Sequence, residues 1–353
     1  MILKEVLNSI EPIDRVTLEK SKAQWLRIAK PLFSLGKLED IISRISAIKG
    51  EVFYSLDKKA VIVMCADNGV VAEGVTQTGQ AMTAVVTENL SKGATSVCLM
   101  AKVAGAEVFP VDIGVAADVK GVTKKEDKLM YGTDNITKGP AMTREVAVKA
   151  VELGISKVYN LKSKGYDIIA TGEMGIGNTT TSSAVASVLL GCRAEEITGR
   201  GAGLSSEGLE RKIKAVKRAI EVNQPDKNDP IDVISKVGGL DIAGLAGVYL
   251  GGAMYKIPVV TDGFISAAAA LVAVRLCPDV LQYIIPSHIS GEGGVRLIMS
   301  ELKLSPVIDG NMCLGEGTGA VALFPLLDMA YNVYGKMLTF DNWNGNDTYT
   351  ILK

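Results

Sequence analysis

"YDIIATGEMGIGNTTTSSAVASVLLG", residues 166–191, joins an apolar run to a glycine-rich turn and then to a segment rich in small residues. The apolar run is nearly continuous, which is typical of a strand buried on both faces of a parallel sheet. The later segment is long enough for a helix and contains no proline. The stretch therefore predicts a strand, a tight turn and a helix, the unit from which α/β folds are built.

The same pattern recurs along the chain. Other apolar runs that end in small, acidic or glycine residues are 60–69, 106–114, 257–264 and 282–291. Because they alternate with helical segments, we expect a doubly wound α/β fold with a mostly parallel, Rossmann-like sheet and a small helical domain. Right-handed crossovers place the strand ends on one edge, where ligands of such folds bind. Six acids follow apolar runs and should gather there: Asp67, Asp112, Glu173, Asp262, Glu292 and Glu316.

The chain of 353 residues exceeds the usual length of one domain. Residues 17–48 space their apolar side chains at helical intervals. We expect residues 1–50 to form part of the small helical domain and residues 55–325 to form the large catalytic domain. Residues 326–353 should form a C-terminal segment that packs with the small domain.

Composition excludes several classes of function. The net charge of −1 provides no basic field for nucleic acid or an anionic membrane. The longest apolar stretches, such as 263–276, are too short to span a bilayer. Five scattered cysteines and no recognisable signal peptide indicate a cytoplasmic protein. With one histidine and no C-x-x-C motif, no metal site is expected, so chemistry must rest on carboxylates, lysines, hydroxyls and backbone dipoles.

The glycine-rich turn of 171–191 is a candidate anion site. Helix N-termini carry unpaired N–H groups and the positive end of the helix dipole, and glycines let a phosphate approach them. The candidates are Gly175, Gly177, Asn178 and Thr179. The Lys-[Ser/Thr] ending of a Walker loop is absent, so ATP is not implied. The alternative is an ordinary strand-to-helix turn.

Further glycine-rich loops occur at 197–216 and 287–294. Their candidate ligand-binding residues are Gly201, Gly203, Lys212, Ser290 and Gly291. Several such loops at one sheet edge favour a pocket for a phosphorylated small molecule. Asp262 precedes the helical segment "ISAAAALVAV", where it is either the N-cap of that helix or a direct ligand contact.

Glu316 stands between two glycines in "LGEGTGA", residues 314–320, at what reads as the end of a strand and the start of a helix. It is either a solvated turn residue or a carboxylate displayed toward a ligand. Gly315 and Gly317 would keep other side chains out of its way, and Gly315 is itself a candidate contact.

The motifs "GEMGIGNTT", "GRGAGL", "GGLDIAGLAG", "TDGFISAAAAL" and "LGEGTGAVALFPLL" occur in this order. They resemble the nicotinate-nucleotide:dimethylbenzimidazole phosphoribosyltransferase family of cobamide lower-ligand assembly. Residues 64–75, 132–147 and 287–294 extend the resemblance to nearly the whole chain.

The resemblance implies transfer of phosphoribose from nicotinate mononucleotide to an aromatic base, without a cofactor or a metal. Glu316 matches the catalytic glutamate, which serves as general base, and Glu173 matches the second active-site carboxylate. The turn after Glu173 matches the phosphate loop. Family members are dimers, which implies a homodimer or a heterodimer with a paralogous subunit.

The segment expected to read the base departs from the family. Thr76, Gly79, Met82 and Val85 lie in it, with Gly79 near a usual proline and Val85 near a usual glutamine. Changed base preference and neutral drift both explain this departure. The acceptor can be dimethylbenzimidazole, another azole, a purine or a phenol. Two other functions stay open: a silent paralogue that supports an active subunit, and an enzyme that hydrolyses the nucleotide.

Overall fold

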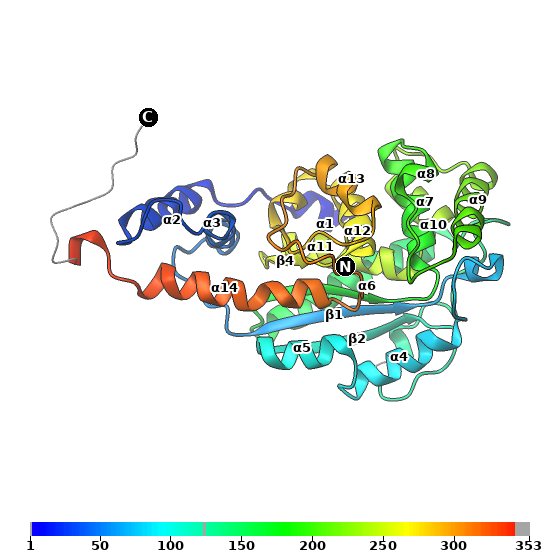
Figure 1. Ribbon diagram of the computed structural model, residues 1–353, viewed down its shortest axis with the longest axis horizontal. Helices are drawn as coiled ribbons and strands as arrows, with labels where there is room; N and C mark the ends of the chain where they lie inside the picture. Colours follow the sequence, from blue (N-terminus) through cyan, green and yellow to red (C-terminus); the bar gives the residue numbers. More distant parts are fainter. Residues whose placement is uncertain (1, 123–124, 343–353) are drawn as a thin grey trace.

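The computed structural model describes residues 2–122 and 125–342. Figure 1 shows a sheet with helices packed around it. The strands are β1 (Lys59–Ala66), β2 (Ala106–Gly114), β3 (Ile168–Met174), β4 (Val259–Thr261) and β5 (Ile284–Pro286). Their order is β2-β1-β3-β4-β5, and every pair is parallel. Each strand falls within one of the apolar runs or begins one residue before it, so the predicted α/β class is confirmed.

Helices cover both faces of this sheet. One face carries α4 (Ala81–Ser91), α5 (Ser96–Ala104) and α14 (Thr318–Lys336), and the other carries α6 (Arg144–Ser163), α11 (Leu240–Met254) and α12 (Phe264–Leu276). The remaining helices are α1 (Leu3–Ser9), α2 (Arg15–Arg27), α3 (Lys37–Lys49), α7 (Asn178–Leu190), α8 (Ala194–Ile197), α9 (Ser206–Asn223), α10 (Pro230–Val237) and α13 (Gly294–Glu301). Short 3₁₀ helices are η1 (Gly69–Glu73), η2 (Lys125–Asp127), η3 (Pro278–Tyr283) and η4 (Phe340–Asn342).

Glycines let α6 and α11 touch through their backbones. A Cβ on Gly154 of α6 would lie 2.0 Å from the carbonyl oxygen of Gly244. A Cβ on Gly247 of α11 would lie 2.0 Å from the carbonyl oxygen of Val151. Because any side chain at these positions would force the helices apart, the contact fixes α11 against the sheet. The start of α11 carries Asp241.

The helices α2 and α3 pack against the C-terminal half of α14. The rings of Trp25 and Tyr334 lie 4.9 Å apart, and the Ser21 and Tyr334 hydroxyls are hydrogen-bonded at 2.8 Å. In contrast, α1 lies on α6 and α11, where the Leu3 amide donates to Glu152 at 2.8 Å. The division into domains stays a prediction, and residues 343–353 of the expected C-terminal segment lie outside the described residues.

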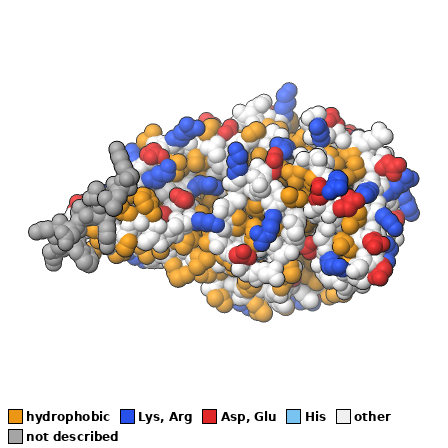
Figure 2. Space-filling model, turned by 45° about the horizontal axis from the view of Figure 1, so that its top comes forward, with side chains coloured by type: hydrophobic (Ala, Val, Ile, Leu, Met, Phe, Trp, Pro, Cys, Tyr) orange, Lys and Arg blue, Asp and Glu red, His pale blue; other side chains and the backbone are white. Residues whose placement is uncertain are grey.

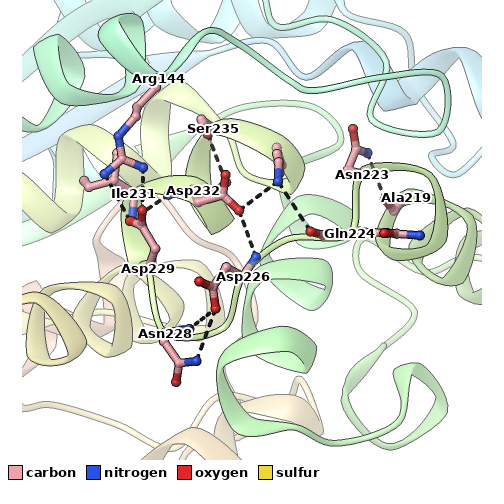
Figure 3. A network of polar contacts seen from close by, with 11 residues as sticks. Arg144, Ala219, Asn223, Gln224, Asp226, Asn228, Asp229, Ile231, Asp232 and Ser235 are labelled. Carbon is pink, nitrogen blue, oxygen red and sulfur yellow. Dashed lines mark hydrogen bonds and ion pairs between the residues drawn. The ribbon is translucent and has the colours of Figure 1, made fainter.

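A polar network fixes the loop between α9 and α10 (Figure 3). Asp229 caps α10 by accepting from the amides of Ile231 and Asp232, both at 3.1 Å. It also forms an ion pair of 2.7 Å with Arg144 at the start of α6. The network therefore ties the end of α9 to α10 and the start of α6, and α9 carries the candidate residue Lys212.

Acidic and basic side chains are interspersed on the face shown in Figure 2. Among the helices of the described residues, none combines the length and the apolar character that crossing a membrane requires.

Candidate active site

A cavity of about 360 Å³ opens at the carboxyl ends of the strands. The sheet order places the switch point between β1 and β3, where ligands of doubly wound folds bind. The predicted residues that line the cavity are Glu173, Gly175, Asn178, Thr179, Gly201, Asp262, Ser290, Gly315 and Glu316. A smaller pocket of about 90 Å³ adjoins it and adds Thr76, Gly177 and Lys212. The structure thus brings together side chains from six separate parts of the sequence.

One end of the site is suited to an anion. Gly177 precedes the first turn of α7 with a φ of +96°, and a Cβ there would lie 2.9 Å from Val71. Lys212 of α9 is only 1% exposed, and its ammonium donates to the Thr179 hydroxyl at 2.8 Å and the Gly199 carbonyl at 3.1 Å. These contacts use two of its three hydrogens, so one remains to bind a ligand.

Burial lowers the pKa of Lys212 to about 8, although the charge of Glu292 opposes the shift. Gly201, with a φ of +55°, leaves the ammonium accessible, because a Cβ there would lie 3.2 Å from Nζ. An anion bound at this end would favour the charged lysine and gain the N–H groups of α7.

The opposite end of the cavity is acidic. Glu173, at the end of β3, is 8% exposed, and its Oε2 accepts a hydrogen bond from the Asn178 amide. Burial raises the pKa of Glu173 to about 8, with the charge of Asp241 as the next cause. Asp241 is fully buried and accepts from the same Asn178 amide at 3.0 Å. Asp241 belongs to the motif "GGLDIAGLAG", but the sequence analysis gave it no role.

Asp262 caps a helix, although not the one that the sequence predicted. Its carboxylate accepts from the amides of Gly317 at 3.1 Å, Gly319 at 2.8 Å and Ala320 at 3.1 Å. It therefore holds the start of α14, whereas α12 begins after Gly263 without a side-chain cap. Of the two roles considered for Asp262, the cap of α12 is wrong, because its carboxylate is directed at a helix start 55 residues later in the chain, and direct ligand contact stays a prediction.

Glu316 lies in the turn that Asp262 holds. Its φ is +60°, a left-handed conformation that is uncommon outside glycine, and Gly315 and Gly317 share it at +89° and +99°. The backbone carbonyl of Glu316 lies against Gly172 of β3, where a Cβ would meet it at 2.3 Å. Its Oε2 accepts from the amide of Val97, in the first turn of α5, at 3.1 Å. The Val97 amide thus fixes the orientation of the Glu316 carboxylate, which forms part of the cavity wall.

The predicted strand before Glu316 is wrong. Residues 303–317 contain no strand, only an isolated bridge between His288 and Ile308. Two of the six acids expected at the sheet edge make structural contacts instead. Asp67 accepts from the Thr83 hydroxyl at 2.6 Å, and Asp112 forms an ion pair with Lys128 at 3.1 Å. Neither lines the cavity.

The residues predicted for the base pocket are not gathered at the cavity. Met82 and Val85 are 41% and 49% exposed on α4, and Gly79 faces open space. Val86 lines the cavity instead. Successive helical residues point about 100° apart, so a shift of one position changes the face. Whether these residues contact a base stays a prediction.

Two predicted glycines, Gly203 and Gly291, lie outside both pockets. The carbonyl of Gly203 accepts from Gln77, which joins its loop to the segment after η1. Gly291 packs on Asn311, where a Cβ would lie 2.9 Å from Oδ1. Both positions support loops that surround the cavity, and a role in binding stays a prediction.

The pH dependence of sulfate binding should report the charge of Lys212. Sulfate keeps the same charge above pH 6, so any change in its affinity there comes from the protein. Sulfate affinity should fall about tenfold per pH unit above pH 8, where the lysine loses its proton. Lys212→Met should bind sulfate weakly and show no such dependence. Isothermal titration calorimetry between pH 7 and 9.5 measures this, and equal affinity across that range in the unmodified protein would contradict the assignment.

Comparison with known proteins identifies the family. Residues 10–344 match a family model described as "Phosphoribosyltransferase". The nicotinate-nucleotide–dimethylbenzimidazole phosphoribosyltransferase of Clostridium acetobutylicum is 51% identical, over 97% of both chains. Its namesake in Acetivibrio thermocellus is also 51% identical, again over 97% of both chains.

Solved structures agree. The crystal structure of CobT from Thermus thermophilus matches with a TM-score of 0.88 and 36% identity, covering 93% of this chain and 98% of that one. The resemblance predicted from the sequence motifs is confirmed: the chain belongs to the nicotinate-nucleotide–dimethylbenzimidazole phosphoribosyltransferase family.

Proposed function

We propose that this phosphoribosyltransferase moves phosphoribose from nicotinate mononucleotide to an aromatic base in cobamide biosynthesis, giving an α-riboside phosphate and nicotinate. The names of its relatives specify a nicotinate nucleotide and dimethylbenzimidazole. The observation that carries the proposal is the polarity of the site. Lys212 and the start of α7 form its cationic end, and Glu173 and Glu316 form its acidic end. Nicotinate mononucleotide has the matching charges, a phosphate and a positively charged ring nitrogen.

In this arrangement, the phosphate binds at Lys212 and the first turn of α7. The bond between C1′ and the ring nitrogen breaks, and its electron pair stays on nicotinate. The positive charge that develops at C1′ faces the carboxyl group of Glu173, as carboxylates face the oxocarbenium ion in glycoside hydrolysis. A nitrogen of the incoming azole bonds to C1′ from the opposite side, and Glu316 accepts the proton from its other nitrogen.

The acceptor side of the cavity is largely apolar. Val86 of α4 and Leu314 line it, and Leu314 is 56% exposed. Apolar contacts of this kind distinguish weakly between ring systems, because one contact is worth about 1–3 kcal/mol. We therefore propose that azoles other than dimethylbenzimidazole, or phenols, are also accepted. With a phenol, the proton lies on the attacking oxygen, so Glu316 would act through a water.

We also propose that the chain works as a dimer, as the family resemblance implies. Exposed apolar side chains next to the acceptor side, namely Met82, Val85 and Leu314, provide a surface that a second subunit can cover. A silent supporting paralogue is not supported, because the matched relatives are named as enzymes. A cytoplasmic location stays a prediction.

A panel of acceptors tests the reaction. The purified chain is incubated with nicotinate mononucleotide and equal concentrations of dimethylbenzimidazole, adenine and p-cresol, and the products are resolved by mass spectrometry. We expect riboside phosphates of dimethylbenzimidazole and of at least one other acceptor. Exclusive use of dimethylbenzimidazole would contradict the broad acceptor range, and nicotinate release without any riboside product would favour a hydrolase.

Glu316→Gln tests the general base. Glutamine keeps the size of the side chain but cannot accept the azole proton, so kcat should fall by about 10²–10⁴ with little change in nucleotide affinity. Steady-state kinetics and a separate binding titration measure the two effects. Glu88 is a half-buried glutamate of α4 that pairs with Lys92, and Glu88→Gln is the matched control that should keep full activity. Near-normal turnover in Glu316→Gln would remove this mechanism.

A further inference from the structure

Glu173 and Asp241 form a buried pair of carboxyl groups that share one hydrogen-bond donor. The Asn178 amide donates to Oε2 of Glu173 and, at 3.0 Å, to Oδ2 of Asp241. An amide offers two hydrogens but no positive charge. Within residues 2–122 and 125–342, neither carboxyl group has an ion-pair partner. Two negative charges on one donor nitrogen, both largely buried, repel strongly, so the pair favours holding one proton.

Glycines make room for this pair at three places. A Cβ on Gly175 would lie 2.8 Å from Oδ2 of Asp241, and one on Gly239 would lie 2.5 Å from Oδ1. A Cβ on Gly315 would lie 2.6 Å from Oε1 of Glu173. These glycines come from the loops after β3, before α11 and before α14. The close approach of the two carboxyl groups is therefore part of how the site is built.

The environment assigns the proton to Glu173. Asp241 lies in the first turn of α11, where the helix dipole favours an anion, and its Oδ1 accepts from the Ile242 amide at 3.0 Å. Burial raises the pKa of Asp241 to about 6, with the Asn178 and Ile242 amides opposing the shift. Burial, and then the charge of Asp241, raises the pKa of Glu173 to about 8. The start of α11 and the Ile242 amide thus favour the negative charge on Asp241, so a single proton held by the pair belongs on Glu173.

The other titratable groups around Glu173 act in the same direction. Asp262, after β4, and Glu316, before α14, add negative charge that opposes ionisation of Glu173. Asp67, after β1, faces Asp241, and burial raises the pKa of the Cys65 thiol on β1, which stays neutral. The basic side chains of the site stand apart: His288 neighbours Asp262, and Lys212 donates to Thr179.

We propose that Asp241 is a positioning residue that keeps Glu173 protonated in the free protein, and that the positively charged ring nitrogen of the nucleotide expels this proton when it binds. The inference rests on the proposed function, because it takes nicotinate mononucleotide as the ligand. The O–H bond of Glu173 breaks, its proton passes to solvent, and its electron pair stays on the carboxylate. That carboxylate then faces the ring nitrogen and afterwards C1′. The anion is thus created only where a cation is present.

Calorimetry measures the released proton directly. Nicotinate mononucleotide is titrated into the protein at pH 7 in two buffers with different ionisation enthalpies. We expect close to one proton released per bound nucleotide. Ribose 5-phosphate carries the phosphate but no cationic ring, so it should release almost none. Titration of Lys212 or of the phosphate would affect both ligands alike, and this comparison separates those groups from Glu173.

Variants separate the two carboxyl groups. Glu173→Gln should abolish the release, and Asp241→Asn should reduce it measurably, because Glu173 then keeps the effect of burial but loses the charge of its neighbour and holds its proton less firmly. Asp167→Asn, at the other end of β3, is the matched control and should release as much as the unmodified protein. A merely structural role of Asp241 would change affinity without changing the number of protons.

The outcomes are distinct. A nucleotide that binds without releasing a proton overturns this inference and leaves the proposed function intact. Full release from Asp241→Asn overturns the role of Asp241. Failure of the unmodified protein to bind nicotinate mononucleotide overturns the proposed function together with this inference. If Asp241→Asn does not fold, the comparison of the two ligands on the unmodified protein still decides whether the proton is released.

Discussion

Three backbone amides at the start of α14 bind one carboxylate, that of Asp262, and the catalytic edge depends on this interaction. The carboxylate comes from the end of β4, whereas the amides follow Glu316. A glutamate with a φ of +60° is strained, and such a conformation persists only where the surroundings determine it. Asp262 from one side and the Gly172 contact on β3 from the other supply that constraint. Glu316 is therefore displayed by tertiary structure and not by its own sequence preference.

The polarity of the cavity follows from where the elements begin and end. The proposed phosphate end consists of the start of α7 and Lys212 of α9, which donates to Thr179. The acidic end gathers carboxyl groups from β3, β4, α11 and the turn before α14. Burial lowers the pKa of Lys212 and raises the pKa of Glu173 toward neutrality. A bound ligand can therefore change the charge of either group. A ligand with a phosphate and a cationic ring favours the charged form at each end.

Local patterns predict what is local. The five strands were predictable because strands buried on both faces need continuous apolar runs, and the turn before α7 was predictable because glycines precede that helix. The helix that Asp262 caps could not be predicted, because the N-cap rule considers the next helix and not one that begins 55 residues later. Asp241 was missed because nothing in an apolar helix start indicates that Asn178 lies beside it. The prediction placed Val85 at the base pocket, but Val86 lines the cavity. The face that α4 turns to the cavity depends on tertiary packing, which the sequence does not show.

A double-mutant cycle tests most directly whether Asp262 acts through Glu316. The value of kcat is measured for the unmodified protein, Asp262→Asn, Glu316→Gln and the double variant. The account predicts that Asp262→Asn lowers kcat at least tenfold in the unmodified protein but causes little further loss in Glu316→Gln, because the misplaced group is already inactive. An equal loss in both backgrounds would contradict the account, since Asp262 would then act independently of Glu316.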